Sequence, residues 1–138
     1  MTIPVELAQL AAAIEEQGTA AYLLTVGSDG RPHAVASTLD FRDEMLVATP
    51  GNSTLANAIA RPLVALVWPP AGLGGYSLIV DAEVVEATGS GHGDNRVALR
   101  PTKAVLHRPA VPGPGAGGDG CGSDCVPVYG AEGESLTG

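Results

Sequence analysis

The sequence predicts a mainly β domain of about six antiparallel strands forming a barrel, with an N-terminal helix and a short helix after the third strand. Short apolar segments are separated by hairpin-length turns, which favours antiparallel pairing. Residues 76–86 alternate apolar and polar side chains, which is typical of a strand buried on one face. A sheet of this many strands avoids exposed edges by closing, so a barrel is expected.

The 138 residues divide into a folded body and a tail. Residues 1–109 carry the periodic segments, and their number suits a single domain. Residues 110–138 are rich in glycine and proline, are acidic and lack lysine and arginine. Such a composition buries little apolar surface, so we expect a tail that is flexible or draped on the barrel.

Four apolar side chains near the N-terminus recur at helical spacing: Leu7, Leu10, Ala11 and Ile14. This spacing puts them on one face of an amphipathic helix. Thr2 is the expected N-cap, Pro4 suits the first turn, and Gly18 is the expected stop.

The strands are expected at 20–26, 32–39, 45–49, 63–68, 76–86 and 96–107. The last segment is a strand or a strand pair interrupted by Pro101. Residues 27–30 have strong turn chemistry and complete the first hairpin. Residues 40–44 are interpreted as a polar turn.

The segment VATPGNSTLANAIARP runs from a strand through a glycine turn into a helix that ends at Arg61–Pro62. Free backbone N–H groups at the helix start, with the hydroxyls of Ser53 and Thr54, can bind a phosphate. The same residue types are also ordinary helix caps. The residues alone therefore leave an anion site and a simple capped helix both open.

Several segments together resemble the pyridoxamine 5'-phosphate oxidase-like family over about residues 5–109. They are the hairpin AYLLTVGSDGRPHAVAS, the strand RPLVALVW, and the later segments GYSLIVDAEVVEA and TKAVLHRPA. The resemblance implies a six-stranded antiparallel split barrel that forms a homodimer. It also implies a flavin (FMN), or in related branches a deazaflavin coenzyme or haem, in a groove at the dimer interface.

The resemblance also implies positions for the cofactor. It places the phosphate at Asn52, Ser53 and Thr54, with Asn57 on the short helix, and the ring system along strands two and three. Arg61 at the helix end is a candidate phosphate ligand, and Trp68 can stack on the ring or fill the core or interface. The candidate cofactor-binding residues are Val35, Ser37, Thr49, Asn52, Ser53, Thr54, Asn57, Arg61 and Trp68.

The sequence departs from the family pattern because its phosphate turn, unlike that of many members, contains no lysine or arginine. Losing a charge-assisted bond weakens binding by about tenfold or more. The expected function is an FMN-dependent oxidoreductase with unknown substrate. The alternatives are a deazaflavin-dependent reductase, a non-catalytic binding protein for flavin, haem or a small metabolite, and a cofactor-free structural dimer.

Composition argues against several other classes. The net charge is −8 and the seven basic residues are scattered, so nucleic acid is not an expected partner. No apolar segment is long enough to span a membrane and no secretory signal is visible, so we expect a cytoplasmic protein.

No side chain is assigned a catalytic role, and no metal site is expected. His33 is a lone strand histidine, a kind that is more often structural or exposed than catalytic. The histidines are dispersed, and no Cys/His spacing matches zinc. Cys121 and Cys125 in the tail are expected to be inert or reversibly oxidised thiols. The nearby GPGAGG matches a dinucleotide motif but lacks the flanking strand and helix.

Overall fold

The computed structural model describes residues 1–18 and 20–110. The chain divides into a barrel unit, Thr2–His107, and a second unit made of Met1 and residues 108–138. All the strands and helices belong to the barrel unit. The predicted tail from residue 111 onward lies outside the described residues, as do Cys121, Cys125 and the GPGAGG segment.

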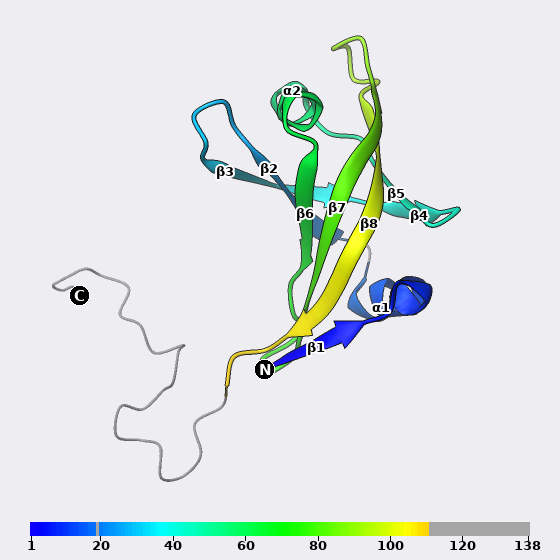
Figure 1. Cartoon of the computed structure of the whole chain (residues 1–138), viewed down its shortest axis with the longest axis vertical. Coiled ribbons are helices and arrows are strands. Elements are labelled where there is room, and N and C mark those ends of the chain that lie inside the picture. Colours follow the sequence, from blue (N-terminus) through cyan, green and yellow to red (C-terminus); the bar gives the residue numbers. More distant parts are fainter. Residues whose placement is uncertain (19, 111–138) are drawn as a thin grey trace, which may run out of the picture. The chain divides into compact units, whose positions relative to one another are not determined.

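The strands of the barrel unit are β1 (Thr2–Val5), β2 (Ala20–Val26), β3 (Pro32–Thr38), β4 (Asp40–Arg42), β5 (Met45–Ala48), β6 (Leu63–Trp68), β7 (Ser77–Thr88) and β8 (Arg96–His107). They form one antiparallel sheet in the order β3-β2-β6-β7-β8-β5-β4, with β1 paired to β8 outside this path. Figure 1 shows the sheet curled into a half-barrel. The mainly β, antiparallel prediction is confirmed, whereas the expected number of six strands was too low.

The first additional strand replaces the expected start of the N-terminal helix. Thr2–Val5 pairs with the end of β8, opposite Ala104–His107. A 3-10 turn, η1 (Leu7–Gln9), follows, and helix α1 (Leu10–Gln17) begins only at Leu10. Thr2 is therefore not a helix cap. The pairing satisfies backbone groups on the edge of β8 that β5 leaves uncovered, and an edge strand tolerates Pro4.

The second additional strand lies in the segment predicted as a polar turn. Asp40–Arg42 pairs with Met45–Val47 around a two-residue turn of Asp43 and Glu44. Both turn residues have positive φ, 51° and 64°. Tight hairpin turns of this conformation usually carry asparagine or aspartate followed by glycine, and Glu44 stands where glycine is expected, so no hairpin was predicted here.

The long strands β7 and β8 bend the sheet. Their register shifts between Asp81 and Ala82 and again between Val84 and Glu86. Such bulges increase the local twist and allow a sheet to curl. Pro101 lies opposite Ala82 within one continuous β8, so it does not divide the strand.

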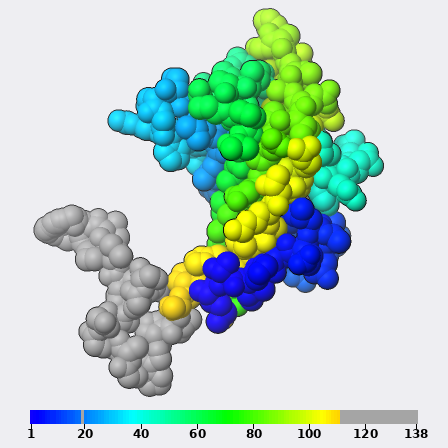
Figure 2. All heavy atoms as spheres, in the orientation of Figure 1, coloured from blue at the N-terminus to red at the C-terminus, as the bar shows by residue number. Residues whose placement is uncertain are grey.

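The inner face of the curled sheet forms the core. Trp68 at the end of β6 is fully buried, together with Leu66, Leu78 and Leu99. Its Nε1 atom has no hydrogen-bond partner among the described residues. This burial excludes Trp68 from stacking on a ligand in an outside groove, so its candidate role at the cofactor is corrected to a core side chain. Figure 2 shows the β2–β3 hairpin (light blue) and the β4–β5 hairpin (cyan) projecting on opposite sides of the barrel unit.

Candidate functional site

A groove of about 480 Å³ lies between strand β3 and the corner where β5 leads into helix α2 (Asn52–Ala60). β3 is the end strand of the sheet path, so no further strand of the described chain covers its outer edge. The groove therefore occupies the split of the barrel. Its lining residues are His33, Val35, Ala36, Ser37, Thr38, Thr49, Pro50, Gly51, Asn52, Ser53 and Thr54.

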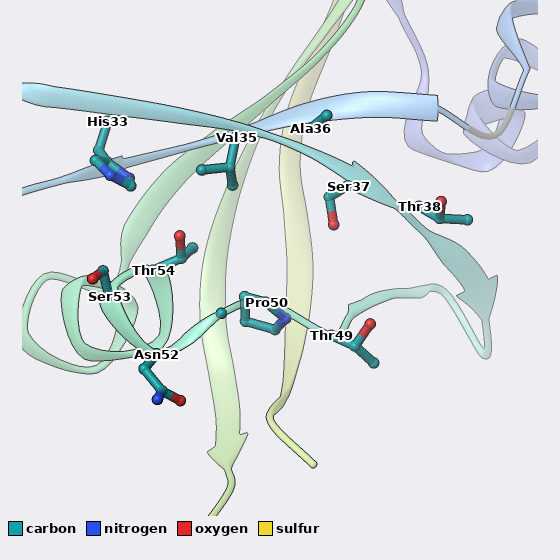
Figure 3. Close-up of a pocket in the computed structure, with 11 residues that line it drawn as sticks. His33, Val35, Ala36, Ser37, Thr38, Thr49, Pro50, Asn52, Ser53 and Thr54 are labelled. Atoms are coloured by element: carbon teal, nitrogen blue, oxygen red, sulfur yellow. The ribbon is translucent and has the colours of Figure 1, made fainter. Parts of the chain in front are cut away.

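Side chains from both walls point into this groove. His33, Val35 and Ser37 alternate along β3 and point toward the start of α2, as Figure 3 shows. Ser53 and Thr54 point back toward β3. The structure thus brings together six of the nine residues that the sequence analysis named, namely Val35, Ser37, Thr49, Asn52, Ser53 and Thr54.

The N-terminus of α2 opens onto the groove without a side-chain cap. Its N-cap is Gly51, which has no side chain to offer, and the first helical bond runs from Leu55 N to Gly51 O at 3.0 Å. The backbone N–H groups of Asn52, Ser53 and Thr54 have no partner among the described residues. The side chains of Asn52, Ser53 and Thr54 therefore do not cap the helix. Unpartnered N–H groups and the helix dipole make this corner suited to an anion.

The lining residues include no lysine or arginine, and His33 is their one titratable side chain. Four of the arginines form ion pairs with carboxylates elsewhere: Arg31 with Asp29, Arg42 with Asp40, Arg96 with Glu86, and Arg100 with Glu83. An anion placed in the groove would rely on hydrogen bonds and the helix dipole, because no lysine or arginine lines it. This agrees with the missing cation noted in the sequence.

Arg61 and Asn57 do not line the groove. Arg61 Nε donates to the carbonyl of Val26 at 2.6 Å, and its Nη2 lies 3.4 Å from Asn57 Oδ1. Asn57 Nδ2 donates to the hydroxyl of Thr25, at 3.2 Å. These bonds tie the last turns of α2 to the end of β2. In this structure both side chains anchor the helix, and their predicted roles at the cofactor find no support in the groove lining.

A residue that the sequence analysis missed supports the helix start from behind. Asn95 is 4% exposed, and its Nδ2 donates to Pro50 O at 3.1 Å and to Asn52 Oδ1 at 2.8 Å. Asn52 also lies against the β7–β8 loop, with its Nδ2 3.5 Å from Gly91 O. Its side chain accordingly points away from the groove in Figure 3, so Asn52 lines the groove mainly with backbone. No spacing in the sequence indicates this contact, because 43 residues separate Asn95 from Asn52.

The loop that precedes Asn95 is closed by a carboxylate. Asp94 Oδ1 accepts hydrogen bonds from the backbone N–H and the hydroxyl of Ser90, each at 2.8 Å. These bonds favour the ionised form and lower the pKa of Asp94 below its ordinary value. The carboxylate therefore helps to hold the loop on which Gly91 and Asn95 lie.

Two further searches covered the described residues. They contain no group of three or more His, Cys, Asp or Glu side chains able to hold a metal ion. No helix among them is both long and apolar enough to cross a membrane.

Comparison with curated proteins finds close relatives in mycobacteria. The chain is 37% identical over 134 residues to an uncharacterised protein of Mycobacterium bovis, Mb0449c, with 88% of this chain and 93% of that protein covered. An uncharacterised protein of Mycobacterium tuberculosis, MT0457, matches to the same extent. This chain belongs to their family. No family model matches the sequence.

Comparison with solved structures identifies the fold. A pyridoxamine 5'-phosphate oxidase-like protein from Listeria innocua superposes with a TM-score of 0.60 at 16% identity, covering 73% of this chain and 98% of that one. An FMN-binding protein from Syntrophomonas wolfei gives 0.58 at 12% identity, with 72% and 84% covered. An F420 reductase gives 0.53 at 20% identity, with 62% and 88% covered. The fold is therefore the split barrel that the sequence resemblance predicted.

Proposed function

We propose that this protein binds a flavin-type coenzyme in the groove and acts as an oxidoreductase. The observation that carries the proposal is the uncapped N-terminus of α2, which opens onto a groove in the split of the barrel. Solved structures with this fold include proteins named for binding FMN and FAD. Their fold alone does not transfer an activity, so the chemistry of the groove has to support it.

The residues of the groove fit such a coenzyme. Its volume of about 480 Å³ lies within the range usual for small-molecule sites. The phosphate would be held by the backbone N–H groups of residues 52–54 with the hydroxyls of Ser53 and Thr54. The ring system would lie along β3, with Val35 offering apolar contact and Ser37 and Thr49 offering hydrogen bonds to polar ring edges.

A bound flavin-type coenzyme supplies the hydride chemistry itself. The protein's task is then to bind and orient it, which suits a groove whose one titratable side chain is His33. Val35 would contact the face of the ring. The hydroxyls of Ser37 and Thr49 would offer hydrogen bonds to its polar edge, and the α2 N-terminus would hold the phosphate end.

FMN is the first candidate, and a deazaflavin coenzyme is the second. The specific observation that favours the second is the absence of a cation among the lining residues. A phosphate monoester such as that of FMN carries a charge between about −1.5 and −2 at neutral pH. A phosphodiester, as in the deazaflavin coenzyme, carries a single negative charge and needs less compensation.

We also propose that the protein is a homodimer. Cross-strand neighbours on β3, β2 and β6 form a continuous apolar patch on the outer face of the sheet, made of Tyr22, Leu24, Ala34, Ala36, Ala65 and Val67. Tyr22, at the centre of this patch, is 46% exposed. A second copy covering this face would remove the patch from water.

Spectroscopy and titration test the coenzyme proposal. Purified protein with the absorption bands of flavin, or apoprotein that quenches FMN fluorescence on binding, supports the first candidate. Binding of a deazaflavin coenzyme without binding of FMN supports the second. Failure to bind either one at millimolar concentration contradicts both. Light scattering tests the dimer, which a monomeric mass at micromolar concentration contradicts.

A further inference from the structure

We infer that Asn95 is a positioning residue that orients the Pro50–Gly51 peptide, so that the Gly51 N–H becomes an additional donor to the anion at the start of α2. This inference rests on the proposed function and deepens it. Asn95 lies outside the groove lining, on the opposite side of the Pro50–Gly51 turn. Its effect on the coenzyme is therefore indirect.

The carbonyl of Pro50 sets the orientation of the Pro50–Gly51 peptide. Its oxygen accepts a hydrogen bond from Asn95 Nδ2 at 3.1 Å, which holds it toward the β7–β8 loop. The peptide bond is trans, so the N–H of the following residue points the opposite way. The N–H of Gly51 is accordingly turned away from Asn95. Because Gly51 lines the groove and Asn95 does not, we infer that this N–H faces the groove. Gly51 is itself a lining residue, and its N–H has no partner among the described residues.

The orientation matters because a rotated peptide would have the opposite effect. If the Pro50–Gly51 peptide turned over, the Pro50 carbonyl would face the groove with its negative end and the Gly51 N–H would be lost to it. A carbonyl oxygen beside a phosphate is repulsive, whereas an N–H donor there is attractive. Asn95 thus stabilises the orientation that suits an anion.

The amide orientation of Asn95 follows from its partners. Both neighbours, Pro50 O and Asn52 Oδ1, can only accept, so the atom facing them must be the NH2 group. The other atom, Asn95 Oδ1, is buried and has no hydrogen-bond partner among the described residues. An unpaired buried acceptor is unfavourable, so a purely structural role would be better served by an apolar side chain. The contribution of the amide therefore lies in its two donated bonds.

Glycine at position 89 is a condition for this arrangement. A Cβ atom built on Gly89 would lie 2.2 Å from Asn95 Oδ1 and 2.9 Å from its Cα. Both separations are far shorter than any real contact, and one of them involves backbone. A substitution at Gly89 therefore has to displace Asn95, which offers a second way to break the network without changing the asparagine.

The test compares FMN with riboflavin, which has the same ring and chain but lacks the phosphate. The ratio of their dissociation constants isolates the contribution of the anion corner. We expect the wild-type protein to prefer FMN, and Asn95→Leu and Gly89→Ala to reduce that preference about tenfold while riboflavin affinity is retained. The matched control is Asn57→Ala, which loosens the other end of α2 and should lower stability without changing the ratio.

A measurement on the wild-type protein keeps the inference testable should the variants fail to fold. Inorganic phosphate is titrated while the backbone amide resonances are followed by NMR. We expect the Gly51 amide to shift together with those of Asn52, Ser53 and Thr54. A Gly51 amide that stays unchanged while the other three shift overturns the role of Asn95 and leaves the anion corner intact.

The remaining outcomes separate this inference from the proposed function. A preference for FMN that persists in Asn95→Leu and Gly89→Ala overturns the inference alone. A wild-type protein that binds both flavins equally, with no amide shifts on adding phosphate, overturns the inference and the phosphate site together. Absence of any flavin-type binding overturns the proposed function as well.

Discussion

Replacing Arg61 tests whether its side chain anchors helix α2 or binds a ligand. The sequence alone made it the one nearby cation for a phosphate. The structure instead shows its Nε donating to Val26 O at 2.6 Å, at the C-terminal end of α2. Replacing Arg61 with alanine removes this bond and a positive charge at the negative end of the helix dipole.

The expected loss of stability follows from these two terms. A hydrogen bond from a charged donor contributes about 1.5–3 kcal/mol, and a cation at a helix C-terminus contributes about 0.3–1 kcal/mol. The long Nη2 contact to Asn57, at 3.4 Å, adds little. We expect a total of about 2–4 kcal/mol, which lowers the melting temperature of a domain of this size by about 8–32 °C.

Two assays check the reasoning on Arg61. Urea or thermal denaturation measures the loss of stability, and flavin titration measures the preference for FMN over riboflavin. Arg61→Lys is the matched control, because it keeps the charge at the helix end and loses the bond geometry, so it should be intermediate in stability. A surface substitution usually changes stability by less than about 0.5 kcal/mol. If Arg61→Ala changes stability by no more than this and also loses the preference for FMN, the anchoring role is refuted.

Three further predictions concern the groove and the turns around it. Replacing both Ser53 and Thr54 with alanine should weaken FMN binding about tenfold, because two hydroxyl donors are removed. Riboflavin affinity should be unchanged in the same titration. Equal losses of affinity for both ligands would place the phosphate elsewhere. Glu44→Gly should raise the free energy of unfolding by about 1 kcal/mol, because Glu44 has a φ of 64° that glycine adopts without strain. Urea denaturation measures this change. An unchanged or lower free energy of unfolding would contradict the prediction. Because its folded-state pKa is lowered, Asp94 should stabilise the fold at pH values above the ordinary 3.8, and this contribution should disappear as pH falls through the lower folded value. Asp94→Asn should therefore flatten the dependence of melting temperature on pH in that acidic range, and a wild-type slope in the variant would contradict the role of the bonds from Ser90.

Much of the sheet was readable from local patterns. Residues 63–68 were predicted as a strand with the bounds that β6 has, because the segment is apolar and ends at Pro62 and Pro69. The first hairpin, 20–26 with 32–38, follows from the turn chemistry of Gly27–Gly30. Helix α2 ends where Arg61–Pro62 predicted. In each case a residue with restricted or unusual backbone freedom marks the boundary within the segment itself.

The two strands that sequence reasoning missed lack a clear local signal. Thr2–Val5 has no strand pattern of its own and is extended because the distant segment Ala104–His107 offers an open edge. Asp40–Arg42 pairs with the nearby β5 across a turn whose second residue, Glu44, is unusual at positive φ. In both cases pairing within the sheet outweighs weak local propensity.

The candidate site was likewise predictable from the sequence only in part. The sequence by itself determined the hydroxyl-rich start of α2 and the alternation that turns His33, Val35 and Ser37 to one side of β3, because both depend on spacing within one element. Only the tertiary structure decided that Trp68 is buried in the core, that Arg61 and Asn57 anchor the helix, and that Asn95 supports the turn at Pro50. The physical reason is that a side chain's role depends on which polar group or apolar surface lies beside it, and those neighbours come from segments far away in the chain.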